Sequence, residues 1–170
     1  QTCALPILQP TPFALYEKYN YEQVCQLLEW PQNEVPLNIG GYKYHRDTKT
    51  YPLFINYHKD EGIQDSIKYE DRFETPTLLK AISKNNRSFT SDDVITAFDA
   101  DKLGVAMHLF MRKNKDDEES KEFYYLGSIH STGRENAEEI MMASDTKAVE
   151  LEYRLDIPVR DDIYDYLLNG

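Results

Sequence analysis

The chain has 170 residues, 41% of them apolar and 29% charged, and this balance excludes a disordered or membrane-embedded protein. Its length suits one domain that could bury roughly 70% of its unfolded surface. The net charge of −11 argues against broad, sequence-blind wrapping of DNA, because binding to phosphates requires a basic surface.

The charge is unevenly distributed along the chain. Residues 1–40 carry a net charge of −3, residues 41–90 carry +2, and residues 91–170 carry −10. The middle block is the only one that is net basic. A mixed, solvated surface would produce the same pattern, so the asymmetry indicates at most a local basic face.

The first seven residues, QTCALPI, are considered apart from the rest. They can be back-translated into a common sequencing adapter, so we interpret residues 1–7 as an artefact and residues 8–170 as a single domain. On this interpretation, we expect the real protein to continue upstream. Because Cys3 lies in the suspected artefact, Cys25 is the only remaining thiol, which fits a reducing cytoplasm.

The first predicted helix follows Asn20, which is a suitable N-cap residue. Gln23, three residues later, completes a capping box, and Val24, Leu27 and Leu28 form an apolar stripe. These features predict a short helix, with the nearby cysteine on or beside its buried face.

Two strands are predicted next, at residues 42–45 and 51–57, joined by a polar turn at residues 46–49. A pair of glycines precedes them and permits backbone angles that are closed to other residues. Residues 68–73 fit either one helical turn or an extended link, and the pattern of residues 78–83 is ambiguous between helix and strand.

A second helix is predicted from Ser91 to about Ala100, because Thr90 and Asp93 resemble a capping box. Residues 105–112 and 122–129 are rich in strand-forming residues and are separated by a strongly polar loop. They predict a hairpin with a long loop.

The last predicted elements are a strand at residues 147–155 and a helix after Pro158. The strand alternates between apolar and polar residues, as expected for a half-buried strand. Asp161 and Asp162 suit the first turn of the helix because they complement its dipole. Together the elements predict an α+β fold, with a curved antiparallel sheet or partly closed pseudobarrel and about three short helices.

Residues 38–73 contain functional groups that a protein core would not favour. Tyrosine rings offer stacking faces for bases, Asn and His side chains can hydrogen-bond to base edges, and cations can hold phosphates. The alternatives are ordinary sheet packing of the tyrosines and a structural ion pair of Arg72 with Glu70 or Asp71. The candidate nucleic-acid-binding residues are Tyr42, Lys43, Tyr44, Arg46, Asn56, Tyr57, His58, Lys59, Arg72, Lys84 and Arg87.

Five ordered motifs carry a family resemblance over nearly all of residues 21–168: NIGGYKY, YPLFINYHK, KYEDRF, FYYLG and PVRDDIYDYL. With them the chain resembles the C-terminal domain of unknown function in bacterial DEAD/DEAH-box helicases of superfamily 2, which often also carry a phospholipase D-like nuclease domain. The resemblance implies an accessory domain of a helicase in a restriction or phage-defence system. It implies no catalytic residues for this segment. Ala81 departs from the pattern, where an aromatic residue is expected.

The resemblance also shapes what we expect of cofactors and partners. We expect no cofactor or metal in this segment, since ATP and magnesium would belong to the helicase core. The expected partners are DNA and the helicase and nuclease domains of the same chain, in the cytoplasm, without a membrane. The histidines and cysteines have no zinc-like spacing, and no phosphate-binding glycine loop or nucleophile elbow occurs.

Two alternatives to nucleic-acid recognition remain open. Asp116, Asp117, Glu119 and Lys121 include a Glu-x-Lys pattern that a metal-dependent nuclease could use, but the signal is weak, because such combinations arise easily in a solvated loop tip with many charges. The acidic residues 91–170 could instead dock against the helicase core or regulate it.

Overall fold

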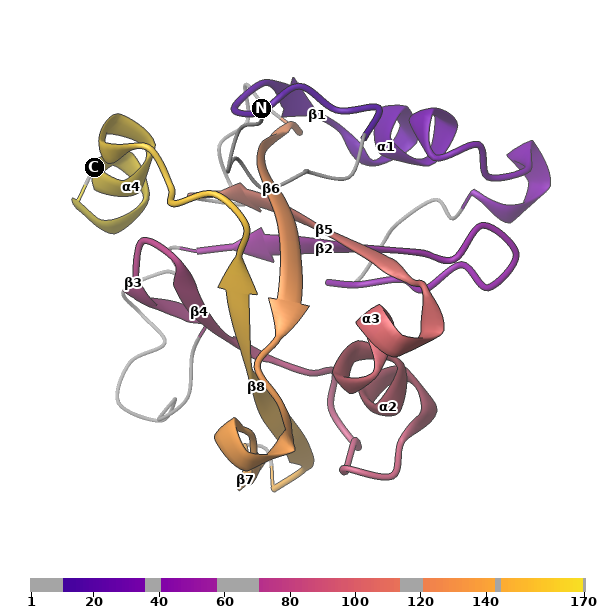
Figure 1. Ribbon diagram of the computed structural model, residues 1–170, viewed down its shortest axis with the longest axis vertical. Helices are drawn as coiled ribbons and strands as arrows, with labels where there is room; N and C mark the ends of the chain where they lie inside the picture. The colour runs from indigo at the N-terminus through magenta and orange to yellow at the C-terminus, as the bar shows by residue number, and fades with distance from the viewer. Residues whose placement is uncertain (1–10, 36–40, 58–70, 114–120, 143–144, 170) are drawn as a thin grey trace, which may run out of the picture.

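The computed structural model describes residues 11–35, 41–57, 71–113, 121–142 and 145–169 (Figure 1). In this part of the chain the strands form one open sheet of eight strands. The main path of the sheet is β2 (Thr50–Asn56), β5 (Ala106–Arg112), β6 (Phe123–Ser131), β8 (Lys147–Leu155), β4 (Leu78–Ile82) and β3 (Arg72–Thr75). Two short strands flank it: β1 (Lys18–Tyr19) pairs with β6, and β7 (Glu138–Met141) pairs with β8.

Four α-helices complete the described fold. They are α1 (Tyr21–Leu27), α2 (Asp92–Phe98), α3 (Ala100–Leu103) and α4 (Asp161–Asn169), with short 3₁₀ turns at Gln32–Glu34 and Arg134–Asn136. Figure 1 shows α2 and α3 beside the start of β5, and α4 near the C-terminus on the opposite side. The predicted α+β class is therefore confirmed, and the sheet is not closed into a barrel.

The long strand β6 connects the two halves of the sheet. Its first part pairs with β5, up to His108 opposite Ser128, and its end pairs with β8, beginning with Ile129 opposite Leu155. The strands β2 and β5 consequently cross the direction of β6 and β8 in Figure 1. A single strand shared between two partners in this way bends the sheet, which agrees with the predicted curvature.

One pairing differs from the antiparallel sheet that the sequence predicted. The strand β2 pairs with β5 in parallel along its whole length, from Thr50 opposite Ala106 to Asn56 opposite Arg112. Parallel neighbours require a crossover of a dozen or more residues, and β3, β4, α2 and α3 all lie between these two strands in the sequence. The sequence showed both strands correctly, but not which strands pair.

The structure confirms the first predicted helix in detail. Asn20 is the N-cap of α1, and its side chain accepts a hydrogen bond from the backbone N–H of Gln23 at 2.8 Å. The Gln23 side chain in turn accepts one from the backbone N–H of Asn20 at 2.9 Å, which completes the box. Val24 and Cys25 are buried on the inner face of the helix, and Leu28 is buried at its C-cap. Leu27 of the predicted apolar stripe is instead 41% exposed.

Several other predicted elements are refined by the structure. Residues 42–45 form isolated antiparallel bridges to β2, between Tyr42 and Leu53 and between His45 and Thr50, and the ambiguous segment becomes strand β4. The predicted capping box at Thr90 and Asp93 is wrong: α2 has Ser91 as its N-cap residue, and its first turn contains Asp93.

The described core forms two clusters on either side of the bent sheet. The larger cluster gathers residues of β2, β4, β5, β6 and β8 with α2 and α4, including the fully buried Leu79, Leu109 and Leu126. The smaller one lies under α1 and contains Cys25, Trp30 and the stacked rings of Phe54 and Phe110. No helix in the described ranges is long and apolar enough to cross a membrane.

Candidate nucleic-acid interface

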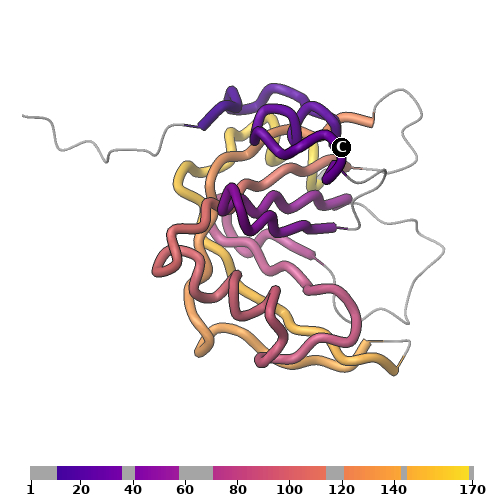
Figure 2. The backbone as a smooth tube through the Cα atoms, turned by 90° about the vertical axis from the view of Figure 1, so that its right-hand side faces the viewer, coloured from indigo at the N-terminus to yellow at the C-terminus, as the bar shows by residue number. Residues whose placement is uncertain are grey.

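Several of the predicted binding residues come from segments that the bent sheet brings together. The segment around Tyr42 runs beside β2, and on its other side it meets β4, where the Tyr42 hydroxyl donates a hydrogen bond to the carbonyl of Ile82. Figures 1 and 2 show this segment between β2 and the β3–β4 pair. The residues that precede β3 and follow β4 therefore lie near those that precede β2.

Tyr42 is half-buried, and its hydroxyl lies in a polar interior. Burial raises the pKa of Tyr42 well above its usual value, and the neighbouring Tyr153 and Asp71 raise it further. Tyr42 therefore stays neutral and acts as a hydrogen-bond donor at any physiological pH. Because its ring packs against the larger core cluster, only part of the ring surface is open for stacking.

Asp71 is a member of this group that the candidate list omitted. Its Oδ1 accepts a hydrogen bond from the backbone N–H of Ile82 at 2.8 Å, next to the carbonyl that Tyr42 uses. Its negative charge contributes to the raised pKa values of both Tyr42 and Tyr57. The KYEDRF motif contains Asp71 and could have identified it. From this motif, however, only the neighbouring Arg72 was predicted to bind nucleic acid.

Tyr57 follows the end of β2 and packs against β3. Its ring stacks on Phe73 with ring centroids 5.8 Å apart, and its hydroxyl accepts a hydrogen bond from the Phe73 backbone N–H at 3.1 Å. Burial is the main cause of its raised pKa. Tyr57 is thus half-buried, and part of its ring is used in packing.

Three of the predicted cations gather at the edge of the same region. Burial lowers the pKa of Lys84, and the nearby positive charges of Arg87 and Lys43 lower it further, although Asp93 opposes the shift. Lys43 is exposed, whereas Arg87 donates from Nε to both carboxylate oxygens of Asp93 at 2.8 and 3.0 Å. Lys43 and Lys84 are therefore the better placed of the three for contacts with phosphates.

Arg72 has a structural role in the sheet. It donates from Nη1 to Glu150 at 2.9 Å and lies 3.4 Å from Glu74, and the hydrogen bond to Glu150 is the main cause of its raised pKa. Glu150 is only 6% exposed, so Arg72 supplies the charge that this buried carboxylate needs. The proposed partner Glu70 lies outside the described residues. A phosphate contact by Arg72 stays a prediction.

The remaining predicted residues have other neighbours. The ring of Tyr44 packs on Tyr51 with centroids 5.5 Å apart, and Tyr44 and Arg46 line a small surface hollow of about 370 Å³ with Glu34. Asn56 accepts a hydrogen bond from Nε of Arg112 at 2.5 Å. His58 and Lys59 lie outside the described residues, as do residues 114–120, which hold the acids of the nuclease alternative.

We call the group formed by Tyr42, Lys43, Tyr57, Asp71, Arg72, Lys84 and Arg87 the Tyr42 face. Its centre offers tyrosine hydroxyls and a carboxylate, and cations lie near its edge. Such a combination supplies both donors and acceptors for a base edge, together with positive charge for phosphates.

The comparisons with known proteins agree with the sequence motifs. Residues 13–167 match the model of a family described as a domain of unknown function, DUF3427. The chain belongs to this family. Among the curated proteins, none matches the chain.

Solved structures resemble this DUF3427 domain in fold. The SRA domain of SUVH5 in complex with hemi-methylated CG DNA has a TM-score of 0.55 and 10% identity, covering 92% of this chain and 98% of that one. Arabidopsis thaliana SUVH6 in complex with SAM has a TM-score of 0.54 and 10% identity, covering 93% and 29%. The DNA modification-dependent restriction endonuclease AspBHI has a TM-score of 0.51 and 13% identity, covering 89% and 78%. At these identities the likeness establishes the fold alone.

Proposed function

We propose that this DUF3427 domain is a non-catalytic domain that recognises nucleic acid, with a preference for DNA that carries a modified base. The observation that carries the proposal is the Tyr42 face, where hydroxyls and a carboxylate lie beside cations. The fold supports it by analogy, because the structures it resembles include SRA domains bound to methylated DNA and a modification-dependent restriction endonuclease.

The two parts of the Tyr42 face would have different tasks. Lys43 and Lys84 would bind phosphates, which positions the DNA without selecting its sequence. Because Tyr42 donates its hydroxyl proton to Ile82, the Tyr57 hydroxyl and the Asp71 carboxylate would supply the donor and acceptor that distinguish one base from another. Because the tyrosine rings are half-buried, hydrogen bonding to a base edge is better supported than stacking on the open face of a ring.

The wider context of the proposal rests on the sequence resemblance. We propose that the domain forms the C-terminal part of a superfamily 2 helicase in a restriction or phage-defence system, in the cytoplasm. The helicase core would then bind ATP and magnesium, and the helicase and nuclease domains of the same chain would act on the DNA that this domain selects.

The phosphate contacts can be tested with a pair of double variants. Changing Lys43→Ala and Lys84→Ala should weaken binding to labelled duplex DNA for all sequences alike. It should also make the salt dependence shallower: the negative slope of log affinity against log salt should shrink in magnitude by nearly 2, because each phosphate contact contributes about 0.9. Fluorescence anisotropy at several salt concentrations measures both effects.

The matched control is Lys102→Ala with Lys121→Ala, which removes two exposed lysines outside the Tyr42 face. It changes the net charge by the same amount, so it should leave the salt slope nearly unchanged. Equal slopes for the two double variants would contradict the assignment of the Tyr42 face. Salt-insensitive binding to helicase domains, with no binding to DNA, would favour the docking alternative.

A further inference from the structure

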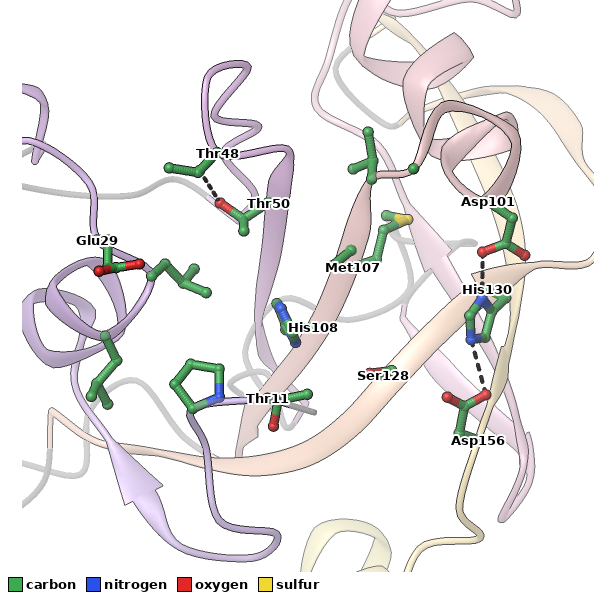
Figure 3. Close-up of a pocket in the computed structure, with 16 residues that line it drawn as sticks. Thr11, Glu29, Thr48, Thr50, Asp101, Met107, His108, Ser128, His130 and Asp156 are labelled. Carbon is green, nitrogen blue, oxygen red and sulfur yellow. Dashed lines mark hydrogen bonds and ion pairs between the residues drawn. The ribbon is translucent and has the colours of Figure 1, made fainter. Parts of the chain in front are cut away.

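A second cavity, of about 620 Å³, lies away from the Tyr42 face (Figure 3). Its walls come from residues 11–12, the end of α1, the start of β2, the start of β5 and the later part of β6. None of the predicted nucleic-acid-binding residues that the structure describes lines it. Its volume lies in the range of small-molecule sites, which is about 300 to 1,000 Å³.

The walls of this cavity combine apolar and hydroxyl surface. Pro12, Leu28 and Met107 supply apolar contacts, while Thr48 and Thr50 place hydroxyl groups at one side, with their oxygens 2.7 Å apart. Leu27, also in the lining, is a large apolar side chain that is 41% exposed. A ligand here would contact an apolar wall and several neutral hydrogen-bonding groups.

His108 provides the most specific polar group in this cavity. It is only 3% exposed, and Figure 3 shows its ring facing the cavity. Its Nδ1 lies 3.3 Å from the Tyr125 hydroxyl, and within the described ranges Nε2 makes no hydrogen bond. Burial lowers the pKa of His108 to about 4, so the ring is neutral near pH 7. No buried side-chain nitrogen or oxygen of the described residues lacks a hydrogen-bond partner, so Nε2 is open to the cavity, where a ligand can donate a hydrogen bond to it.

Charge selects the class of ligand that fits. The described residues that line the cavity include Glu29, Asp101 and Asp156 but no lysine or arginine. Asp101 and Asp156 use their Oδ1 atoms to hold the two ring nitrogens of His130, at 2.6 and 2.9 Å. Their Oδ2 atoms make no hydrogen bond in the described part of the chain. Asp156 also lies 3.6 Å from Nη1 of Arg154, which is outside the lining. A phosphate or carboxylate would meet mainly negative charge here.

We propose that this cavity binds a cation carried on a short apolar stem, namely an alkylammonium or alkylguanidinium group. The stem packs on Pro12, Leu28 and Met107, and the cation reaches the rim carboxylates. A free amine and an arginine or lysine side chain of a protein partner share this chemistry. The inference is independent of the proposed DNA binding, because the two sites share no residue.

Titration of the full chain with three probes, followed by two-dimensional NMR, tests the proposal. The probes are agmatine, a capped pentapeptide with one central arginine, and the same peptide with citrulline, which keeps the shape of arginine but has no charge. We expect agmatine or the arginine peptide to shift the signals of His108 and its neighbours. The citrulline peptide should bind at least tenfold more weakly. Agmatine alone binding would identify a free amine, and tighter binding of the peptide a protein side chain.

A variant that fills the cavity tests the location. Ala106 is exposed and lines the cavity, so Ala106→Trp should block the site without disturbing the core. Glu138→Trp, at an exposed strand position outside the cavity, is the matched control. Binding that is lost in the first variant and kept in the second supports the proposal. Equal binding of the charged and uncharged peptides, binding unaffected by Ala106→Trp, or no binding of agmatine or the arginine peptide overturns it.

Discussion

Four polar side chains are buried in the described part of the chain: His45, Ser83, His108 and Glu150. All four have partners distant in sequence. His45 meets Glu34 at 2.5 Å, Ser83 accepts a hydrogen bond from the Val149 N–H at 2.8 Å, His108 lies 3.3 Å from the Tyr125 hydroxyl, and Glu150 meets Arg72. Such pairings cannot be read from local patterns. The alternation at residues 147–155 therefore places Glu150 on the polar face of the strand, whereas in the structure this carboxylate is buried and pairs with Arg72.

At the scale of single residues, His108 gives a prediction for stability against pH. Burial lowers its pKa from 6.5 to about 4, so below pH 6.5 the unfolded chain binds a proton that the folded chain does not. The contribution of the neutral ring is complete above pH 6.5 and is lost as the pH falls toward 4. Between pH 7 and 4.5 we expect this group to lower the free energy of unfolding by about 2 kcal/mol.

The measurement is urea denaturation of the wild type and of His108→Met at both pH values. Methionine fills a similar volume and does not titrate, so the variant should lose less stability on acidification than the wild type, by that same amount. The carboxyls of Asp99 and Asp162, whose pKa values are lowered by arginines, titrate below this window. Equal losses in both proteins would show that His108 is not buried as a neutral ring.

At the scale of elements, the segments with complete local signals were predicted well. The helix α1 carries its cap and capping-box partner within a few residues, and β8 alternates from Val149 to Leu155. The parallel pairing of β2 with β5 was missed, because alternation identifies a strand but says nothing about its partner. The capping box predicted for Thr90 and Asp93 was wrong, because the Asp93 side chain instead accepts hydrogen bonds from Arg87.

The capping box of α1 provides the prediction at this scale. Changing Asn20→Ala removes the acceptor of the Gln23 N–H and should lower the free energy of unfolding by about 1 kcal/mol. Asn20→Asp keeps an acceptor oxygen in the same place and should change stability much less. Chemical denaturation of both variants measures the difference. If both lose the same stability, the cap does not contribute as described.

The candidate site could be predicted only in part from the sequence. The motifs NIGGYKY and KYEDRF identified Tyr42 and Arg72, but the contact of Tyr42 with β4 depends on the tertiary fold. The importance of Asp71 likewise follows from the fold, because Asp71 and Tyr42 both hydrogen-bond to the backbone of Ile82, which is forty residues from Tyr42 in the sequence. The role of each cation depends on which acids fold near it. Arg72 pairs with the buried Glu150, whereas Lys43 is exposed.

At the scale of the whole molecule, the fold reconciles an acidic chain with DNA binding. The chain has a net charge of −11, yet the bent sheet gathers Lys43, Lys84 and Arg87 at one edge of the Tyr42 face. The acids elsewhere would repel DNA from other surfaces and leave one basic approach. We therefore expect binding that is local, salt-sensitive and weak on unmodified DNA.

The most direct test measures the affinity of the purified chain for matched DNA duplexes, unmodified and with methylated or hydroxymethylated cytosine, at two salt concentrations. Labelled single strands of the same sequences serve as a second set. The account predicts salt-sensitive binding with at least a tenfold preference for one modified duplex, equivalent to about 1.4 kcal/mol. A folded protein that binds none of these DNAs, or that binds all of them equally, would contradict the recognition of a modified base.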